Sequence, residues 1–546
     1  MSDVKIIGMD GQPIVNRPSR ASMLANSSNV PYDAADMSGA HTAAWNPYLG
    51  SADADLNMYR DRIASRARDL VRNDGWASGA VTRLLDNTVG ANLRPISKPD
   101  YRALAQITGN KQFDADWADE FGRAVEARWR LWALDPGKWS DAQRQMNISQ
   151  LFRIAFRHKL VDGDALAIMR WMPDRIARGG ARYATVLQLI DPDRLSNPML
   201  TFDMANCRGG VEIDEFGAAV GYHIRKAHQG DWWSAAESMT WDYIPRETQW
   251  GRPIVVHDFE ADRAGQHRGG AGIFTPVMQR LKMLIKYDGT ELDAAIVNAI
   301  FGAYIQSPYD PNMVESALGD DDDLGAYQDM RSVFHKERRI AVGDVRMPTL
   351  FPGESINTVS AARPSGNFAA FEGAVLRNVA AGTGLSAQQV SNNWSDVNYS
   401  SARGALLEAW KTLSRRRDEF TSHFCQPIFA AFLEELFDRG ELPLPDGAPD
   451  FIEARGAYAR ARWMGPGRGW IDPVKEKEGS ILGMDGGLST LENEAAENAG
   501  EDWEEILDQR AREISAFKER GMTAPTWAGI DNPSKTIGDK IEGADS

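Results

Sequence analysis

The chain has 546 residues, of which 43% are hydrophobic and 25% are charged, and its formal net charge is −16. A length of this order predicts about three to four domains or fewer large ones, and the near-average composition excludes a wholly disordered, collagen-like or disulfide-scaffold chain. The acidic balance argues against tight DNA binding, which needs a basic surface, but not against a protein that DNA must pass without sticking.

A soluble protein in a reducing compartment is expected. Cys207 and Cys425 lie far apart and form no Cys-x-x-Cys pair, so neither a structural disulfide nor a cysteine zinc site is predicted. The N-terminus has no long apolar run before Asp10, which argues against a signal peptide. The longest uncharged apolar-leaning run, residues 294–309, is shorter than a membrane span of ~20 residues and predicts a buried helix.

The first 134 residues predict an arm followed by helices. Residues 1–50 are rich in Ser, Ala, Asn and Pro with little periodicity, which predicts an extended arm. Residues 55–85 carry apolar side chains at helical spacing, and Asn73-Asp74-Gly75 predicts a break between two helices. A further helix is expected over residues 113–134, with large apolar side chains on one side: Trp117, Phe121, Val125, Trp129 and Trp132.

The segment 150–260 predicts a mostly antiparallel sheet. After a helix over residues 151–160, short runs rich in β-branched and apolar residues predict strands. These runs are 165–169, 185–190 and 253–257, together with a hairpin formed by 211–213 and 220–224. The fold class expected from the residues is therefore α+β.

Helices dominate the second half of the chain. Thr275-Pro276 predicts the N-cap and first turn of a helix that reaches Ile300. A small mixed unit follows, with an apolar run at 303–305, a helix over 324–336 and a strand over 339–342. Further helices are expected over 368–381, over 399–437 with a kink at Pro427, and within 472–520, followed by a loose tail over 523–546.

No enzyme signature is visible, so no catalytic residue, metal or cofactor is expected. The chain lacks a Gly-x-x-x-x-Gly-Lys-Ser/Thr loop, a Gly-x-Ser-x-Gly elbow and a His-Glu-x-x-His helix. The acidic run Asp320 to Asp323 raises the alternative of a metal-dependent nuclease. Four consecutive carboxylates splay apart, however, and a solvated loop is favoured by about four to one.

Two further clusters are interpreted as structural. Arg415-Arg416-Arg417 fans over most of a helical turn, which favours contacts with solvent or another subunit over a nucleic-acid surface. The segment 465–470, Gly-Pro-Gly-Arg-Gly-Trp, is not a nucleotide-binding loop, because no strand is expected before it. It predicts a turn that pairs Trp463 with Trp470.

Several stretches together resemble a known family. They are Asp262 to Gly270 leading into Thr275-Pro276, then Gly384-Leu385-Ser386, Asn398-Tyr399-Ser400-Ser401-Ala402-Arg403, and Trp463 to Pro473. Their order and spacing resemble the portal proteins of tailed bacteriophages, lambda family, over roughly residues 20–520, and the combination is more specific than any one motif.

The resemblance implies a portal-type fold with long stem and wing helices, a mostly antiparallel β wing, a small α/β clip and a helical crown. The implied map is an N-terminal arm over 1–54, a wing over 55–273, a stem helix over 274–302, a clip over 303–362, a second stem helix over 363–383, a tunnel loop over 384–398, a long wing helix and return segment over 399–470, a crown over 471–522 and a flexible tail over 523–546.

The resemblance also implies a function and partners. Such proteins form a ring of twelve at one capsid vertex, through which the terminase packages double-stranded DNA that is later ejected. The implied partners are the terminase large subunit, the major capsid and scaffold proteins and the head-completion or tail-adaptor proteins, with no membrane. The implied location is the virion, and the host cytoplasm during assembly. The alternatives are a capsid or adaptor protein without a channel and, less favoured, the nuclease.

Two sets of site residues follow from the implied map. The tunnel loop would present polar, uncharged side chains to DNA that passes non-specifically: Gln388, Gln389, Asn392, Asn393, Trp394 and Ser395. No Lys or Arg lies between Leu385 and Asn398, so phosphates would be contacted only by weak, exchangeable hydrogen bonds. The clip would dock the terminase or an adaptor through Asp321, Asp322, Tyr327, Arg331 and Lys336.

Overall fold

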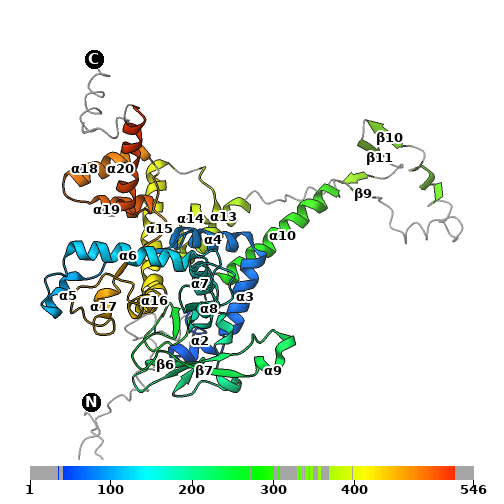
Figure 1. The fold of residues 1–546 in the computed structure, drawn as a ribbon. Coiled ribbons are helices and arrows are strands. Elements are labelled where there is room, and N and C mark those ends of the chain that lie inside the picture. Colours follow the sequence, from blue (N-terminus) through cyan, green and yellow to red (C-terminus); the bar gives the residue numbers. More distant parts are fainter. Residues whose placement is uncertain are drawn as a thin grey trace, which may run out of the picture.

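The computed structural model describes residues 35, 41–270, 272–300, 304–306, 329–330, 332–334, 336, 339–342, 345–348, 355–357, 368–395, 398–470 and 472–522. Figure 1 shows a helical and β body, a long helix that projects from it, and a group of C-terminal helices on the opposite side. Within the described residues, no helix is both long enough and apolar enough to cross a lipid bilayer.

The N-terminal part of the body consists of helices, and the break between two of them lies where the sequence predicts it. Helices α2 (Ala52–Asn57), α3 (Arg60–Asn73) and α4 (Gly75–Thr88) follow one another. The Asp74 carboxylate accepts the Ala77 N–H at 2.8 Å and so caps α4. The predicted break between two helices is confirmed. Helices α5 (Tyr101–Thr108) and α6 (Ala115–Ala133) come next.

An aromatic core joins α6 to the second half of the chain. All five apolar side chains predicted to share one side of α6 are buried. Trp132 stacks on Phe432 with ring centroids 4.6 Å apart, and Trp129 meets Phe429 edge-on at 5.6 Å. The two phenylalanines come from α16 (Gln426–Asp438), about 300 residues later in the chain. This contact between distant helices makes one continuous core for the body.

Two antiparallel sheets complete the body and confirm the α+β class. Strands β2 (Asp164–Trp171), β3 (Thr185–Ile190) and β8 (Val255–Phe259) form a sheet in the order β3-β2-β8, in which Leu166 pairs with Ile190 and His257. Helix α7 (Ile148–Asp162) leads into β2. The second sheet has the order β4-β5-β6-β7, with strands Cys207–Arg208, Val211–Ile213, Ala219–Arg225 and Trp241–Pro245. Short helices α8 (Asp174–Ala177) and α9 (Ala235–Ser238) lie in the connections.

The projecting helix is α10 (Met278–Ile300), and α13 (Phe368–Thr383) returns along it. Tyr287 on α10 stacks on Phe368 at 5.6 Å and meets Phe371 at 5.0 Å. Thr275 does not cap α10 as expected, because its hydroxyl donates to Gly272 O at 2.9 Å and the helix begins three residues later. Between the two helices lie β9 (Tyr304–Gln306) paired with β12 (Ser355–Asn357), and β10 (Arg339–Val342) paired with β11 (Val345–Pro348).

The predicted long helix is continuous but widened near its middle. Helix α15 (Tyr399–Phe420) passes through a π-helical turn, η6 (Thr421–Cys425), into α16. Pro427 lies in the first turn after η6, where its missing N–H costs no helical hydrogen bond. A kink was predicted at Pro427, and the structure has a π turn directly before this residue.

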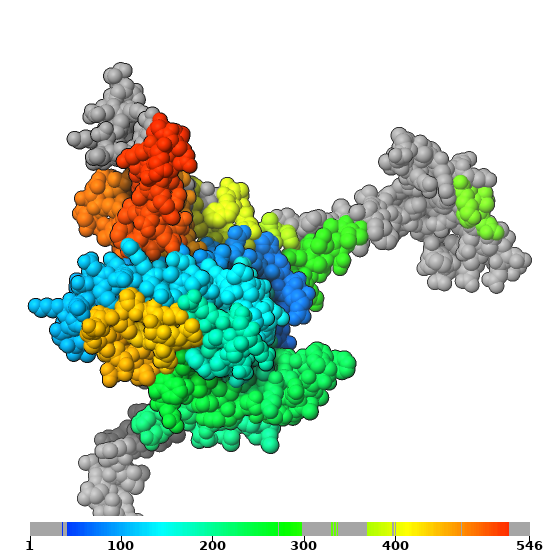
Figure 2. Space-filling model, in the orientation of Figure 1, coloured from blue at the N-terminus to red at the C-terminus, as the bar shows by residue number. Residues whose placement is uncertain are grey.

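The C-terminal helices form a group on one side of the body (Figure 2). They are α18 (Pro473–Asp485), α19 (Leu491–Glu494), the π turn η7 (Ala495–Ala499) and α20 (Trp503–Glu519), after α17 (Arg455–Tyr458). Strand β13 (Ala461–Met464) pairs antiparallel with β1 (Arg94–Ser97). Ion pairs Arg94–Glu505 at 2.9 Å and Arg123–Glu504 at 3.0 Å hold α20 against the body.

Candidate functional site

The segment between α13 and α15, predicted as a tunnel loop, begins with a short helix. Helix α14 (Ala387–Ser391) opens with a capping box, in which the Ser386 hydroxyl accepts the Gln389 N–H at 3.2 Å and Gln389 Oε1 accepts the Ser386 N–H at 3.0 Å. Gln389 is therefore engaged in holding α14, whereas Gln388 on the same helix is half-buried. The segment predicted as a tunnel loop over residues 384–398 therefore includes one short helix, α14.

Residues 392–395 are exposed and follow α14 directly. Asn392 ends α14 in the left-handed region at φ 52°, a conformation that asparagine tolerates better than most residues. Asn393 Oδ1 accepts from both the N–H and the hydroxyl of Ser395, at 3.0 and 2.6 Å. Trp394 is 41% exposed beside them. The structure thus presents three of the predicted polar residues and one indole on a single turn.

Arg83 lies beside this turn, although no basic residue occurs within the segment itself. It reaches from α4 and donates to Asn392 Oδ1. The packing explains the approach, because the buried Val390 of α14 belongs to the core that α4 shares. Sequence reasoning missed Arg83, since more than 300 residues separate it from the segment.

Two residues of the trio Arg415–Arg416–Arg417 bind the ends of helices next to this segment. Arg416 donates to the carbonyl of Thr383, the last residue of α13, at 2.8 Å. Arg417 donates to the carbonyl of Thr88, the last residue of α4, at 2.8 Å. Both contacts place a cation on helix C-terminal carbonyls that have no partner within their own helix. The expectation of solvent or inter-subunit contacts is wrong for these two.

Arg415 keeps a surface role. Its guanidinium pairs with Glu419 at 2.6 Å and with Glu260 at 3.3 Å. The three side chains therefore point in three different directions, as expected for consecutive positions on a helix. Since each already has a partner within the chain, the trio does not form a free basic patch.

The Asp262–Gly270 motif forms the ionic centre of the body. Arg268 donates to Asp164 Oδ2 from Nε at 2.9 Å and from Nη2 at 2.8 Å. Arg60 reaches the same oxygen at 2.9 Å, and His257 contacts Asp164 Oδ1 at 3.0 Å. Burial alone would raise the pKa of Asp164, but the charges of Arg268 and Arg60 together with His257 hold it well below its ordinary value.

The glycines of the motif are explained by close backbone contact. Gly163, the C-cap of α7, has φ 93°, and a Cβ at this position would lie 2.9 Å from Gly270 O. A Cβ on Gly269 would lie 2.0 Å from Gly163 O. The chain can therefore cross itself here only if no side chain intervenes. The motif is a structural junction and does not form a ligand site of its own.

The segment from Trp463 to Pro473 differs from its prediction in two respects. Strand β13 leads directly into the glycine-rich turn, so a strand does precede it. Trp463 packs edge-on against Trp129 and Phe152 in the core, whereas Trp470 is 39% exposed and lies under Lys477. The predicted tryptophan pair is therefore not formed. Arg417 also donates to Pro466 O at 2.9 Å, which ties this turn to the long helix.

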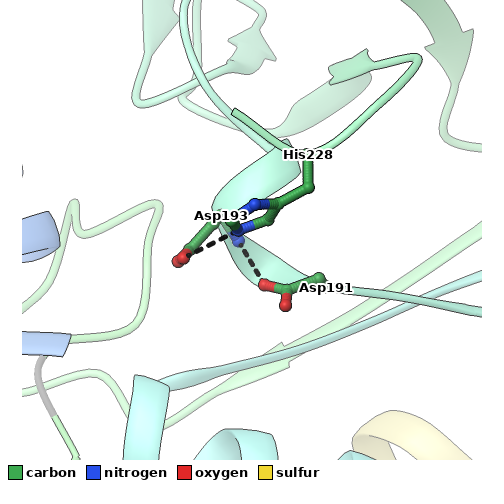
Figure 3. Close-up of side chains that lie close together, drawn as sticks. All are labelled: Asp191, Asp193 and His228. Atoms are coloured by element: carbon green, nitrogen blue, oxygen red, sulfur yellow. Dashed lines mark hydrogen bonds and ion pairs between the residues drawn. The ribbon is translucent and has the colours of Figure 1, made fainter. Parts of the chain in front are cut away.

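One cluster of side chains, Asp191, Asp193 and His228, has the composition of a metal site (Figure 3). His228 Nε2 lies 3.4 Å from Asp193 Oδ2, and the Asp193 N–H donates to Asp191 Oδ1 at 3.0 Å. The guanidinium of Arg68, however, pairs with Asp193 at 2.6 Å and with Asp191 at 3.2 Å. Since the Arg68 guanidinium already supplies a positive charge, the cluster is an ion-pair network.

The predicted clip residues are mostly outside the described part of the chain. Asp321, Asp322, Tyr327 and Arg331 fall there, as does the acidic run to which the nuclease alternative refers. Lys336 is described, helical and exposed. The predicted strand at residues 339–342 is confirmed as β10.

The relatives found by comparison with known proteins are all named portal protein or probable portal protein. Residues 38–417 match the family described as phage portal protein, lambda family. The portal protein of Escherichia phage N15 is 34% identical over 497 residues, 90% of this chain and 91% of the relative. Portal protein B of Escherichia phage lambda is 34% identical over 502 residues, 90% of each chain. A probable portal protein of Halomonas phage phiHAP-1 is 24% identical over 489 residues, 88% of this chain and 86% of the relative.

Two solved structures were also matched. The neck of an empty GTA particle, computed with C6 symmetry, aligns at 13% identity with a TM-score of 0.42, covering 79% of this chain and 92% of that one. The neck of a native GTA particle, computed with C12 symmetry, aligns at 13% identity with a TM-score of 0.34, covering 72% and 91%. At these TM-scores the likeness does not bear on the assembly of this chain. Because the family match spans more than half of the chain and two relatives at 34% identity cover nine-tenths of it, the chain belongs to the lambda family of phage portal proteins.

Proposed function

We propose that this portal protein assembles into a ring of twelve at one vertex of the capsid, through which double-stranded DNA enters and leaves. The observation that carries the proposal is the membership of the portal family, with relatives named portal protein along nine-tenths of the chain. Its location is then the virion, after assembly in the host cytoplasm. No catalytic role is assigned to any residue.

The projecting helices support an assembly of several copies. On α10, Met283, Leu292 and Ile296 are large apolar side chains that are more than half exposed. An isolated chain gains nothing from leaving such residues in water, whereas a contact with another copy would bury them. We assign the stem role to α10 and α13, the wing to residues 55–273, the crown to 471–522 and the remaining boundaries to those of the implied map.

The turn at residues 392–395 is the proposed DNA contact. Its side chains are neutral, and Arg83, which lies beside it, already donates to Asn392. Neutral polar groups contact phosphates weakly, so a duplex would slide past them without being held. In this proposal Asn393, Trp394 and Ser395 face the duplex, while Gln388 and Gln389 support the turn through α14.

The partners follow from the same assignment. The clip, residues 303–362, would dock the terminase large subunit during packaging and a head-completion or tail-adaptor protein afterwards. The wing and crown would face the major capsid and scaffold proteins. The alternative of a capsid or adaptor protein without a channel differs in stoichiometry, and the nuclease alternative would require metal-dependent cleavage that is lost in Asp321→Ala.

The first test is the mass of the purified chain by mass photometry, with negative-stain microscopy of the same sample. A species at twelve times the 60.4 kDa chain mass with a central hole is expected. Monomers in solution together with no rings in capsids would overturn the proposal. Monomers in solution with rings in capsids would show that assembly requires a scaffold.

A further inference from the structure

Arg83 on α4 brings a positive charge to the exposed turn at residues 392–395. Its side chain and that of Asn392 are both exposed, and its Nη2 donates to Asn392 Oδ1. The one acidic residue of α4, Asp86, is already paired with Arg153 of α7 at 2.9 Å. Within the described part of the chain, no carboxylate lies within ion-pair distance of Arg83. Because an amide is neutral, the bond to Asn392 orients the guanidinium without cancelling its charge.

The two arginines of α15 next to this segment do not have a free charge of this kind at the surface. Arg416 and Arg417 are half-buried, and they donate to the carbonyls that end α13 and α4. Arg83 has a single acceptor, Asn392, among the described residues, whereas a guanidinium carries five N–H donors. Further donors of Arg83 are therefore directed to the surface beside the turn.

The packing of α14 against α4 fixes the separation between Arg83 and the turn. Val390 of α14 is buried in the same core as Val81 and Leu84 of α4. Asn392 ends α14 two residues later, at φ 52°. Since the Arg83 guanidinium contacts the first residue of the turn, a duplex lying against the turn would bring phosphate oxygens close to the same guanidinium.

We propose that Arg83 retains a resting DNA duplex by donating to a phosphate oxygen, and that Asn392 Oδ1 accepts from the same guanidinium when no phosphate is near. The inference rests on the proposed function and assigns a second, charged contact to the same channel site. Hydrogen bonds between a guanidinium and an anionic oxygen are roughly twice as strong as bonds between neutral groups. A phosphate therefore competes effectively with the Asn392 amide for Arg83.

The second acceptor explains how one cation can hold a resting duplex and still let a moving duplex pass. When a phosphate leaves, Asn392 is positioned to accept from Arg83 again, so the guanidinium does not lose every partner at once. This exchange lowers the free-energy cost of each step from one phosphate to the next. A carboxylate at residue 392 would instead form an ion pair with Arg83 and compete with the phosphate.

The test is the rate at which filled capsids without tails lose their DNA. Capsids are assembled with the full-length chain carrying Arg83→Gln, and the DNA that becomes accessible to nuclease is measured over time. The rate is expected to rise by about tenfold or more, as for the loss of one hydrogen bond to a charged group, and to depend less on salt. Arg102→Gln, which removes an exposed arginine of α5, is the matched control and is expected to keep the native rate.

Two further variants separate the charge of Arg83 from its packing. Asn392→Asp keeps a residue that tolerates the left-handed conformation but gives Arg83 a carboxylate partner. It is expected to lose DNA about as fast as Arg83→Gln. Arg83→Lys keeps the charge, so its rate is expected to lie closer to the native rate than to that of Arg83→Gln. Equal rates for Arg83→Lys and Arg83→Gln, or a native rate for Asn392→Asp, would overturn the proposal.

The outcomes distinguish this contact from the proposed function. Mass photometry of each variant reports the ring, and the DNA content of fresh capsids reports packaging. If the native chain forms rings that package DNA while Arg83→Gln retains DNA as the native chain does, the Arg83 contact is overturned and the proposed function stands. If the native chain forms no rings in solution or in capsids, the proposed function is overturned together with this contact.

Discussion

Arg268 and Asp164 form a two-point ion pair, with Arg268 Nε and Nη2 at 2.9 and 2.8 Å from one carboxylate oxygen. Both side chains are almost completely buried, at 3% and 0% exposure. Arg268 also donates to the carbonyls of Leu195 and Gly209. The pair thus joins β2, the loop after β3 and the turn before β5 to the motif that precedes the projecting helix.

Replacing Arg268 with lysine is expected to destabilise the body by about 3–5 kcal/mol, because Asp164 would lose a two-point partner in a buried site. The measurement is the free energy of unfolding by urea. Arg263→Lys, which alters a half-exposed ion pair with Asp55, is the control and is expected to cost less than about 1 kcal/mol. Equal effects of the two variants would contradict the role given to the buried pair.

Glu126 on α6 is expected to make stability depend on pH. Burial raises its pKa to about 7, aided by the nearby Asp502 carboxylate and opposed by the Ser97 N–H and by Arg130 and Arg94. Between about pH 4.5 and 7 the folded state keeps a proton that the unfolded chain has lost, so the free energy of unfolding falls as pH rises through this window.

Glu126→Gln stays neutral and can still accept the Ser97 N–H, which Glu126 accepts at 2.9 Å. It is expected to be more stable than the native chain at pH 8 by roughly 1–3 kcal/mol and similar at pH 4. Melting temperatures at the two pH values measure the difference. Glu120→Gln, exposed on the same helix, should leave both values nearly unchanged. A pH-independent effect of Glu126→Gln would contradict a protonated Glu126 in the folded state.

Gly163→Ala is expected to destabilise more than Gly109→Ala, although both glycines end helices at positive φ. A Cβ at Gly109 meets nothing within 4 Å, so only the left-handed conformation costs energy, about 1–2 kcal/mol. A Cβ at Gly163 would also lie 2.9 Å from Gly270 O, and displacing that backbone raises the cost to about 3 kcal/mol or more. Denaturant unfolding of both variants compares them. Equal losses would show that the junction with Gly270 is not tight.

Adding a positive charge at the exposed turn tests the proposed DNA contact. Asn393→Lys would give each copy a new phosphate-binding cation, so packaging is expected to slow while ring mass stays unchanged. The measurement is the yield of DNA-filled particles, and the slowing should diminish at higher salt. Gln112→Lys, exposed in the loop between α5 and α6, adds the same charge elsewhere. Normal packaging by Asn393→Lys would count against placing this turn in the channel.

Deleting residues 392–395 is the complementary change. It keeps α14 and the buried Val390, so assembly is expected to persist while packaging or retention of DNA declines. Mass photometry and the DNA content of particles give the two readouts. A normal yield of DNA-filled particles would contradict the proposed role of the turn.

The sequence by itself determined the local elements, because their signals are local. The spacing of Trp117, Phe121 and Val125 predicted α6, and Asp74-Gly75 predicted the boundary between α3 and α4. Strands β2, β3, β5, β6 and β8 were predicted from short runs rich in β-branched and apolar residues, whereas β4 and β7 were not predicted. The motifs also indicated the family, since their order along the chain is itself sequence information.

Only the tertiary structure decided which side chains meet. Arg416 and Arg417 could not be placed on the ends of α13 and α4 from their own neighbours, because each contact depends on helices distant in the chain. The same reason explains why Trp463 was predicted to pair with Trp470 but packs against Trp129 instead. Periodicity reports the conformation of a segment, whereas charge pairing and core packing depend on how segments fold against one another.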